Sequence, residues 1–160
     1  MEPNIQIIEF GTKERPVTTT TSTSTTAGSS VPAASSGMFM HPLNGAGVMS
    51  SGYGTRWGSF HGGLDVAAPS GTPIYASAAG MVTYSGYHTG GYGNLVIIDH
   101  GNGYETYYAH NSVNYVNVGQ KVSQGQNIAG VGTTGNSTGN HVHFEIRYNG
   151  KQLNPYSYIY

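Results

Sequence analysis

The stretch "IIDHGNGYETYY" (residues 97–108) predicts a β-hairpin. Its two halves are rich in apolar and aromatic residues, and they flank Asn102-Gly103, a pair that readily adopts the positive φ angles of a two-residue turn. Asn149-Gly150 offers a second turn of the same kind. Because such turns join antiparallel neighbours, the sequence favours an antiparallel sheet.

Short segments bounded by Gly, Pro, Asn or Ser surround this hairpin and predict further strands. The expected strands cover residues 72–78, 80–87, 94–100, 104–110, 126–132 and 141–148. No segment shows helical periodicity over about ten residues. We therefore expect a mainly β fold, an antiparallel β-sheet domain with little or no helix and with a groove walled by Gly/Tyr-rich loops.

The composition of the 160 residues excludes several classes of protein. Charged residues make up 8% of the chain and the net charge is −1, without the basic excess of a nucleic-acid-binding protein. No apolar run approaches the length of a membrane span. The chain has no cysteine, so a metal site must use His, Asp or Glu. Seven histidines against six Lys plus Arg indicate imidazole chemistry.

The N-terminal part differs from the rest of the chain. Residues 1–16 include "NIQIIEFGTKERP", which alternates like an edge strand and resembles the closing strand of G-five domains of Gram-positive surface proteins; a floppy terminus is the alternative. Residues 17–37 include "TTTTSTSTTAGSS", which is too polar to collapse and predicts a flexible linker. The folded domain is expected over 38–160. Because the first residues lack signal-peptide features, we expect a fragment of a longer precursor if the protein is exported.

Three places combine His or Asp at spacings that suit a metal site. "FHGGLDVAAP" holds His61 and Asp65, and the two glycines between them favour a bend rather than a helix. "HVHFEIRY" holds His141 and His143, which lie on the same face if the segment is a strand. His110 ends the expected strand "YETYYAH".

The chemistry of these five side chains suits zinc. A catalytic zinc site uses three protein ligands and keeps a fourth position open, and imidazole with carboxylate serves where thiolate is absent. Three of the five groups could bind the metal, and two would remain for proton transfer. The residues alone leave open which three bind.

Four blocks of the sequence resemble the lysostaphin-type zinc metalloendopeptidases, which are peptidoglycan hydrolases. These blocks are "GYGTRWGSFHGGLDVAAPSGTPIYASAAGMV", "YGNLVIIDHGNGYETYYAH", "VNVGQKVSQGQNIAGVGTTGNSTGNHVHFEI" and "NPYSYI". The resemblance implies that His61, Asp65 and His143 are zinc ligands. It further implies that His110 and His141 form the catalytic pair.

Two small departures from the family pattern accompany these motifs. Asn111 follows His110, and Val142 lies between His141 and His143, where leucine is commoner in both places. Neither side chain is a ligand, so the departures leave the implied chemistry intact.

The resemblance implies a zinc-dependent endopeptidase that hydrolyses peptide bonds in the stem or cross-bridge of bacterial peptidoglycan. We expect one zinc ion per chain, a monomer, and a location outside the cell or at the cell wall. Since the sequence has no His-Glu-x-x-His motif, one of His110 and His141 would accept the proton of the metal-activated water and the other would steady the oxyanion. Which residue takes which role stays open.

Two other kinds of protein share features with this sequence. A non-catalytic cell-wall-binding or hydrolase-activating module of the same fold characteristically loses metal ligands, and this chain keeps all of them. "VNVGQKVSQGQNIAGVG" also resembles lipoyl and biotinyl carrier domains, whose modified lysine stands at a hairpin tip beside Asp or Met. Here Lys121 stands between Gln120 and Val122. An active enzyme is therefore the favoured interpretation.

Four further residues have open or structural interpretations. Glu145 shares the expected strand face of His143, so it either orients a histidine or pairs with a cation in solvent. His100 precedes the hairpin turn and is interpreted as a turn residue. Tyr87 and Tyr92, in the expected loop "SGYHTGGYGN", either wall a groove or are merely exposed.

Overall fold

The computed structural model describes residues 38–160. These residues include the whole predicted peptidase domain and every candidate site residue. The predicted tail (1–16) and the predicted linker (17–37) lie outside the described residues.

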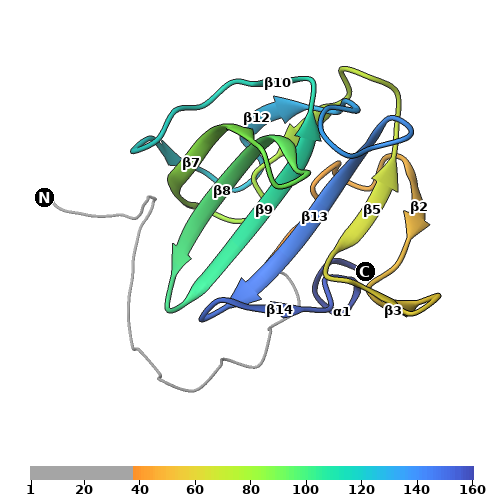
Figure 1. The fold of residues 1–160 in the computed structure, drawn as a ribbon. Helices are drawn as coiled ribbons and strands as arrows, with labels where there is room; N and C mark the ends of the chain where they lie inside the picture. Colours follow the sequence, from red (N-terminus) through yellow and green to blue (C-terminus); the bar gives the residue numbers. More distant parts are fainter. Residues whose placement is uncertain (1–37) are drawn as a thin grey trace, which may run out of the picture. The chain divides into compact units, whose positions relative to one another are not determined.

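An antiparallel sheet of eight strands forms the frame of the described domain (Figure 1). Its strands follow the order β11-β7-β8-β9-β13-β5-β2, and β14 also pairs with β13. The strands span β2 (Val48–Ser51), β5 (Leu64–Ala67), β7 (Gly80–His88), β8 (Gly93–Gly101), β9 (Tyr104–Asn111), β11 (Lys121–Val122), β13 (His141–Tyr148) and β14 (Lys151–Leu153).

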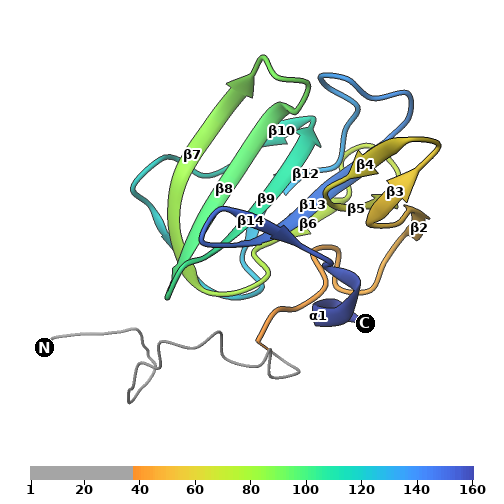
Figure 2. The ribbon, with the colours of Figure 1, turned by 60° about the horizontal axis from the view of Figure 1, so that its bottom comes forward.

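A small sheet and a separate hairpin complete the β-structure. The small sheet has the order β10-β12-β6 and lies against one face of the large sheet (Figure 2). The remaining elements are β3 (Gly54–Arg56), β4 (Ser59–His61), β6 (Pro73–Tyr75), β10 (Val113–Asn114), β12 (Asn127–Gly130) and α1 (Tyr156–Ile159). Since α1 is a single turn, the prediction of a mainly antiparallel β fold with little helix is confirmed.

Both predicted Asn-Gly turns are present. Asn102 and Gly103 have φ angles of 55° and 90° and join β8 to β9, while Asn149 and Gly150 have φ angles of 49° and 82° and join β13 to β14. Glycine and asparagine tolerate these angles better than other residues. The turns therefore set the antiparallel register around β13.

Each of the six predicted strand segments contains a strand. The expected loop over 85–94 is shorter than predicted, because β7 continues to His88 and β8 begins at Gly93. Pairing along the whole hairpin explains this extension, with His88 opposite Gly93. Lys121 lies in the edge strand β11, opposite Met81 of β7, and not at a hairpin tip. The structure thus offers no support for a carrier domain.

The core lies between the large sheet and the small sheet. Strand β13 shows how the sequence divides the two faces: Val142, Phe144 and Ile146 are completely buried among apolar side chains, and the alternate residues carry imidazole or charge. Such alternation is the strand's period of two. Each Å² of apolar surface removed from water stabilises the fold by about 25 cal/mol, so these three buried side chains hold β13 in the sheet.

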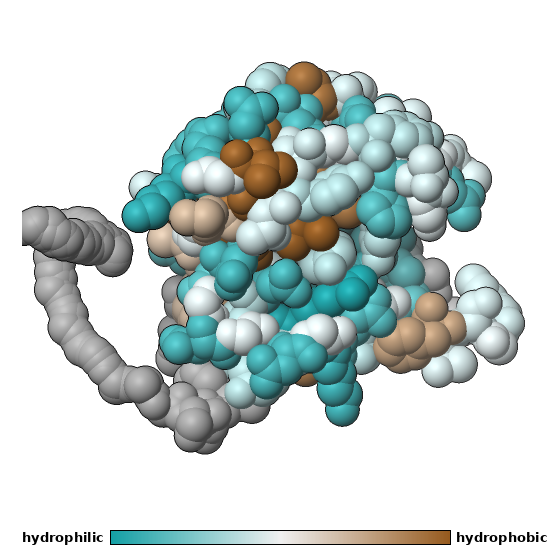
Figure 3. Space-filling model, turned by 60° about the vertical axis from the view of Figure 1, so that its left-hand side comes forward, coloured by the Kyte–Doolittle hydropathy of each residue, from teal (hydrophilic) through white to brown (hydrophobic). Residues whose placement is uncertain are grey.

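The surface on the β7 side is mostly hydrophilic or neutral, with separate apolar patches rather than one continuous band (Figure 3). Among the described residues, no helix has the length and apolar character needed to cross a membrane.

Candidate active site

Strand β13 presents His141 and His143 on the face of the sheet opposite to the core. In the register between β13 and β5, His143 lies directly opposite Asp65. Residues paired in this way hold their side chains about 5 Å apart at Cβ. A hydrogen bond of 2.8 Å accordingly joins His143 Nδ1 to Asp65 Oδ1.

His61 reaches the same point from the end of β4. Its Nδ1 donates to the carbonyl oxygen of Gly52 at 2.8 Å, and its Nε2 lies 3.2 Å from Asp65 Oδ1. Only glycine fits at Gly63 in the connection to β5, because a Cβ there would lie 2.6 Å from the carbonyl oxygen of Phe144. This close passage of the chain over β13 brings His61 and Asp65 together.

The three predicted ligands form a possible metal site. One ligand atom from each of His61, Asp65 and His143 lies within 4.8 Å of the others. Two donor atoms bound to one tetrahedral zinc stand about 3.3 Å apart, given bond lengths of about 2.0–2.2 Å. The contacts of 2.8 and 3.2 Å to Asp65 Oδ1 are close to that spacing. Two imidazoles and one carboxylate are also a donor set that suits zinc.

The electrostatics of this cluster favour a positive charge. Burial alone would lower the pKa of His143, but hydrogen bonds to Asp65 and Glu145 outweigh it and raise the pKa to about 9. Burial acts to raise the pKa of Asp65, yet the hydrogen bonds and charges of His143 and His61 hold it well below its usual range. A metal ion would replace this shared proton, since metal binding requires deprotonated ligands.

His110 and His141 lie beside the three-residue cluster, with their ring centroids 4.8 Å apart. His110 Nδ1 lies 2.8 Å from the carbonyl oxygen of Thr134, and His141 Nδ1 lies 2.8 Å from that of Gly139. Because a carbonyl only accepts, each Nδ1 carries the hydrogen and each Nε2 is left for proton transfer. His141 Nε2 stands 3.7 Å from Asp65 Oδ1.

The backbone of His110 has an unusual conformation. Its φ angle is +66°, in the left-handed region that non-glycine residues rarely adopt, although the residue lies within β9. Strained backbone of this kind is concentrated at functional sites. Burial lowers the pKa of His110, which favours the neutral ring.

Glu145 lies two residues after His143 on the same face of β13 and is only 1% exposed. Its Oε2 accepts hydrogen bonds of 2.8 Å from His143 Nε2 and from the Tyr92 hydroxyl, and its Oε1 accepts one of 2.7 Å from Arg147 Nε. Arg147 also lies 4.0 Å above the ring of Tyr107. Both interpretations of Glu145 hold in part: it orients a histidine and pairs with a cation, but the pair is buried rather than solvent-facing.

The pKa values support a fixed Glu145–Arg147 pair. Burial opposes ionisation of Glu145, but its contacts with His143 and Arg147 lower the pKa to about 2. Burial and the Glu145 charge raise the pKa of Tyr92 to about 12, so its hydroxyl keeps the hydrogen it donates. The network holds His143 with Nε2 protonated and Nδ1 directed at the possible metal site.

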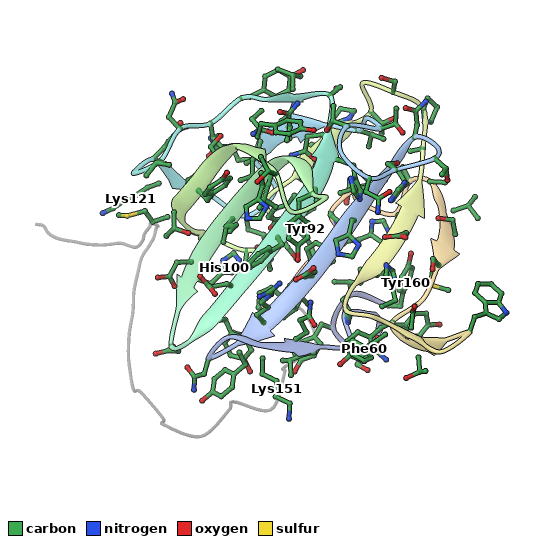
Figure 4. All side chains as sticks on the ribbon, in the orientation of Figure 1. Phe60, Tyr92, His100, Lys121, Lys151 and Tyr160 are labelled. Carbon is green, nitrogen blue, oxygen red and sulfur yellow. The ribbon has the colours of Figure 1, made fainter. Side chains whose placement is uncertain are left out.

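A groove of about 580 Å³ opens over the five residues. One wall comes from the β7–β8 connection, with Gly90 and Tyr92, and the other contains Phe60, Gly62 and Gln152. Figure 4 shows Tyr92 over the central strands and Phe60 toward the β3–β4 hairpin.

These walls settle the interpretation of the two tyrosines. Tyr92 lines the groove, whereas Tyr87 is 60% exposed and does not line it. The structure brings all five predicted site residues into one groove. Sequence reasoning missed Gln152 and the carbonyls of Thr134 and Gly139. The sequence before β13 shows only a polar loop, and a polar loop does not indicate which of its carbonyls would contact a histidine.

Comparison with known proteins identifies the fold and the family. Residues 59–155 match the model of peptidase family M23, which is more than half of the chain. This chain belongs to peptidase family M23. The resemblance to lysostaphin-type peptidases drawn from the sequence motifs is thereby confirmed.

Three similar proteins illustrate the range of this M23 family. The chain is 52% identical over 97 residues to DD-carboxypeptidase/endopeptidase Mpg of Neisseria meningitidis, covering 61% of this chain and 22% of that protein. It is 47% identical over 97 residues to murein hydrolase activator NlpD of Escherichia coli, covering 61% and 25%. The catalytic domain of lysostaphin from Staphylococcus simulans aligns with a TM-score of 0.67 at 31% identity, covering 72% of this chain and 92% of that one. The matched segment spans about a quarter of the two curated relatives.

Proposed function

We propose that the protein is a zinc-dependent endopeptidase that hydrolyses peptide bonds in the stem or cross-bridge of bacterial peptidoglycan. The observation that supports this most is the convergence of the five predicted residues on one open groove. Membership of peptidase family M23 supports the reaction class. Relatives whose names refer to a lipoprotein and to murein support an extracellular or cell-wall location.

His61, Asp65 and His143 would hold the zinc ion, one per chain. Bound zinc supplies Lewis acidity, which polarises a carbonyl and lowers the pKa of a coordinated water. The residues fit this role because each histidine anchors its other nitrogen on the protein: His61 donates to Gly52, and His143 donates to Glu145. Such anchoring fixes the ring orientation and typically matters 10- to 100-fold for metal affinity.

His110 and His141 would move the protons. Each ring presents Nε2 to the groove, so one can accept a proton from the attacking water and return it to the leaving amine. The other would steady the developing oxyanion. The site offers no other unpaired acid or base for this task among the described groove residues, since Glu145 is tied to His143, Tyr92 and Arg147.

The groove suits a slender, uncharged peptide. Its walls carry glycine, tyrosine, phenylalanine and glutamine, and its two acidic groups, Asp65 and Glu145, are both paired with His143. Relatives named endopeptidase or peptidase support a peptide bond as the substrate, and a relative whose name refers to murein supports peptidoglycan as its source. We propose that the protein acts as a monomer, since one chain supplies the whole site.

A second candidate is a non-catalytic activator of murein hydrolases. The similarity to NlpD, which is named as such an activator, favours it. The presence of all five site residues favours the enzyme instead.

Digestion of purified peptidoglycans with different cross-bridges distinguishes the two. The full chain should release peptides with new amino and carboxyl termini, zinc chelation should abolish release, and added zinc should restore it. Mass spectrometry of the products identifies the bond. If the zinc-loaded protein releases nothing but accelerates a separate murein amidase, the activator is the correct function.

A further inference from the structure

We propose that the β12–β13 loop (residues 131–140) positions both catalytic imidazoles through its backbone carbonyls, with Thr134 as the positioning residue. This inference rests on the proposed function, in which His110 and His141 transfer protons. It assigns a role to a segment that contributes no acid, base or metal ligand of its own.

The loop touches each imidazole with one backbone carbonyl. The Thr134 carbonyl accepts from His110 Nδ1 at 2.8 Å, and the Gly139 carbonyl accepts from His141 Nδ1 at 2.8 Å. The Ser137 hydroxyl donates to the same Gly139 carbonyl at 2.8 Å. One loop thus selects the Nδ1-protonated form of both rings, although His110 comes from β9 and His141 from β13.

The Thr134 side chain ties this loop to the large sheet. Its hydroxyl donates to the Asn111 carbonyl at 2.8 Å and accepts from the Asn94 N–H at 3.0 Å. Asn111 directly follows His110, and Asn94 lies near the start of β8. Thr134 therefore fixes its own carbonyl relative to the chain that carries His110.

Close contacts between glycines lock the loop against the chain that carries Tyr92. A Cβ on Gly135 would lie 2.4 Å from the Gly93 nitrogen, and a Cβ on Gly93 would lie 2.5 Å from the Thr134 carbonyl carbon. The Asn136 N–H donates to the Gly91 carbonyl at 2.8 Å. Backbones this close leave little room for the loop to shift.

Substitutions of Thr134 can therefore remove the hydrogen bonds of its hydroxyl while keeping the size of the side chain. Valine has nearly the same shape but cannot pair with Asn94 and Asn111. The glycine contacts would still hold the loop in place, but the carbonyl at His110 would lose the two hydrogen bonds that fix its direction. Serine keeps the hydroxyl. Displacement of a catalytic group by about 1 Å can cost about 100-fold in rate.

The experiment compares Thr134→Val with Thr134→Ser, and uses Thr83→Val on the exposed face of β7 as a control for the same exchange. Imidazole ¹⁵N–¹H correlation spectra of the metal-free full chain, at a pH where the rings are neutral, report the tautomers of His110 and His141. Steady-state hydrolysis of peptidoglycan peptides by the zinc-loaded proteins gives kcat and KM. Elemental analysis gives zinc content.

The wild type should show Nδ1–H at both His110 and His141. Thr134→Val should show mixed tautomers at His110 and a kcat about 10- to 100-fold lower, with KM and zinc content nearly unchanged. Thr134→Ser and Thr83→Val should stay within about threefold of wild type.

Three results would overturn the proposal: an Nε2–H tautomer at either ring in the wild type, an unchanged His110 signal in Thr134→Val, or equal losses in the serine and valine variants. The first needs no variant, so it decides the matter even if Thr134→Val fails to fold. A wild type that hydrolyses nothing contradicts the proposed function, while the tautomer signals still test the positioning of the rings.

Discussion

The groove and the C-terminal end of β8 both hold histidine rings, but they leave those rings in different states. At the end of β8, His100 uses both ring nitrogens within the protein: Nδ1 donates to the Ala79 carbonyl at 2.8 Å, and Nε2 lies 2.7 Å from Thr106 Oγ1. Thr106 Oγ1 lies 2.6 Å from the Tyr108 hydroxyl, which accepts from the Ser77 N–H. Both nitrogens of His100 therefore have a partner within the protein, and neither is left to bind a substrate.

In the groove, each ring has one anchored nitrogen. His61, His110 and His141 donate through Nδ1 to backbone carbonyls, and His143 hydrogen-bonds to Glu145 through Nε2. The other nitrogen of each ring faces the groove or Asp65. The comparison teaches that a histidine is structural when both of its nitrogens are paired outside the groove, and available for chemistry when one nitrogen is anchored and the other faces the groove or the Asp65 carboxylate of the possible metal site.

The largest effect is expected at the possible metal site. His143→Ala removes one of the three proposed ligands, so nearly all zinc and all measurable hydrolysis should be lost, with zinc determined by elemental analysis. His100→Ala serves as the comparison, because it deletes a hydrogen-bonded ring outside the groove and should keep one zinc per chain. Full zinc retention by His143→Ala would remove that residue from the ligand set.

The next effect separates proton transfer from metal binding. His110→Ala should depress kcat by about 10² to 10⁴, the usual contribution of a general acid or base, while zinc content and the melting temperature stay close to wild type. Peptidoglycan digestion and elemental analysis on the same preparation check this. Activity within about threefold of wild type would show that the open nitrogen of His110 takes no part in the reaction.

A smaller effect is expected where a ring is anchored. Glu145→Gln keeps the shape but weakens the acceptor for His143 Nε2, and zinc affinity should fall about 10- to 100-fold. Competition with a chromophoric chelator measures the affinity. Glu105→Gln, a carboxylate of β9 outside the groove, should leave it unchanged. Equal affinities in the two variants would show that the buried network does not support the metal site.

The smallest expected effect is on the stability that the neutral His100 ring contributes. Burial lowers the pKa of His100 from 6.5 to about 4. Between these values the unfolded chain binds more protons than the folded one, so the contribution of neutral His100 is complete above about pH 6.5 and is lost as the pH falls toward 4. Unfolding free energy of the wild type should drop by about 2 kcal/mol more than that of His100→Gln between pH 8 and pH 5.

Urea unfolding at several pH values measures this difference. Because both proteins share every other titrating group, their different pH dependence isolates His100. If the unfolding free energies of the two proteins changed in parallel with pH, His100 would have the same pKa in the folded chain as in the unfolded chain.

Much of the fold could be predicted from local sequence. Alternation along 141–148 placed the core face of β13, and the Asn-Gly pairs at 102–103 and 149–150 placed two turns, because both signals act over only a few residues. The β3–β4 hairpin was not predicted. Its turn uses Trp57 and Gly58 with φ angles of 46° and 78°, and a tryptophan at such an angle has no recognised turn signal.

The candidate site was predictable as a set of residues but not as a geometry. Motif spacing and family resemblance selected the five side chains that the groove brings together. The interpretation of His100 as a turn residue was wrong, because His100 lies within β8 and its partners are Ala79, just before β7, and Thr106 of β9. The roles of Glu145 and of the Thr134 carbonyl likewise depend on contacts between distant segments, which spacing along the chain does not encode.

The division of labour along β13 has an evolutionary consequence. Groove residues and core residues occupy alternate positions of a single strand, so substitutions at the odd-numbered positions 141 and 143 change the groove while Val142, Phe144 and Ile146 still hold the fold. An insertion or deletion of one residue would instead exchange the two faces. Lineages of this domain can therefore exchange or abandon their chemistry by single substitutions, whereas gaps within this strand should be purged.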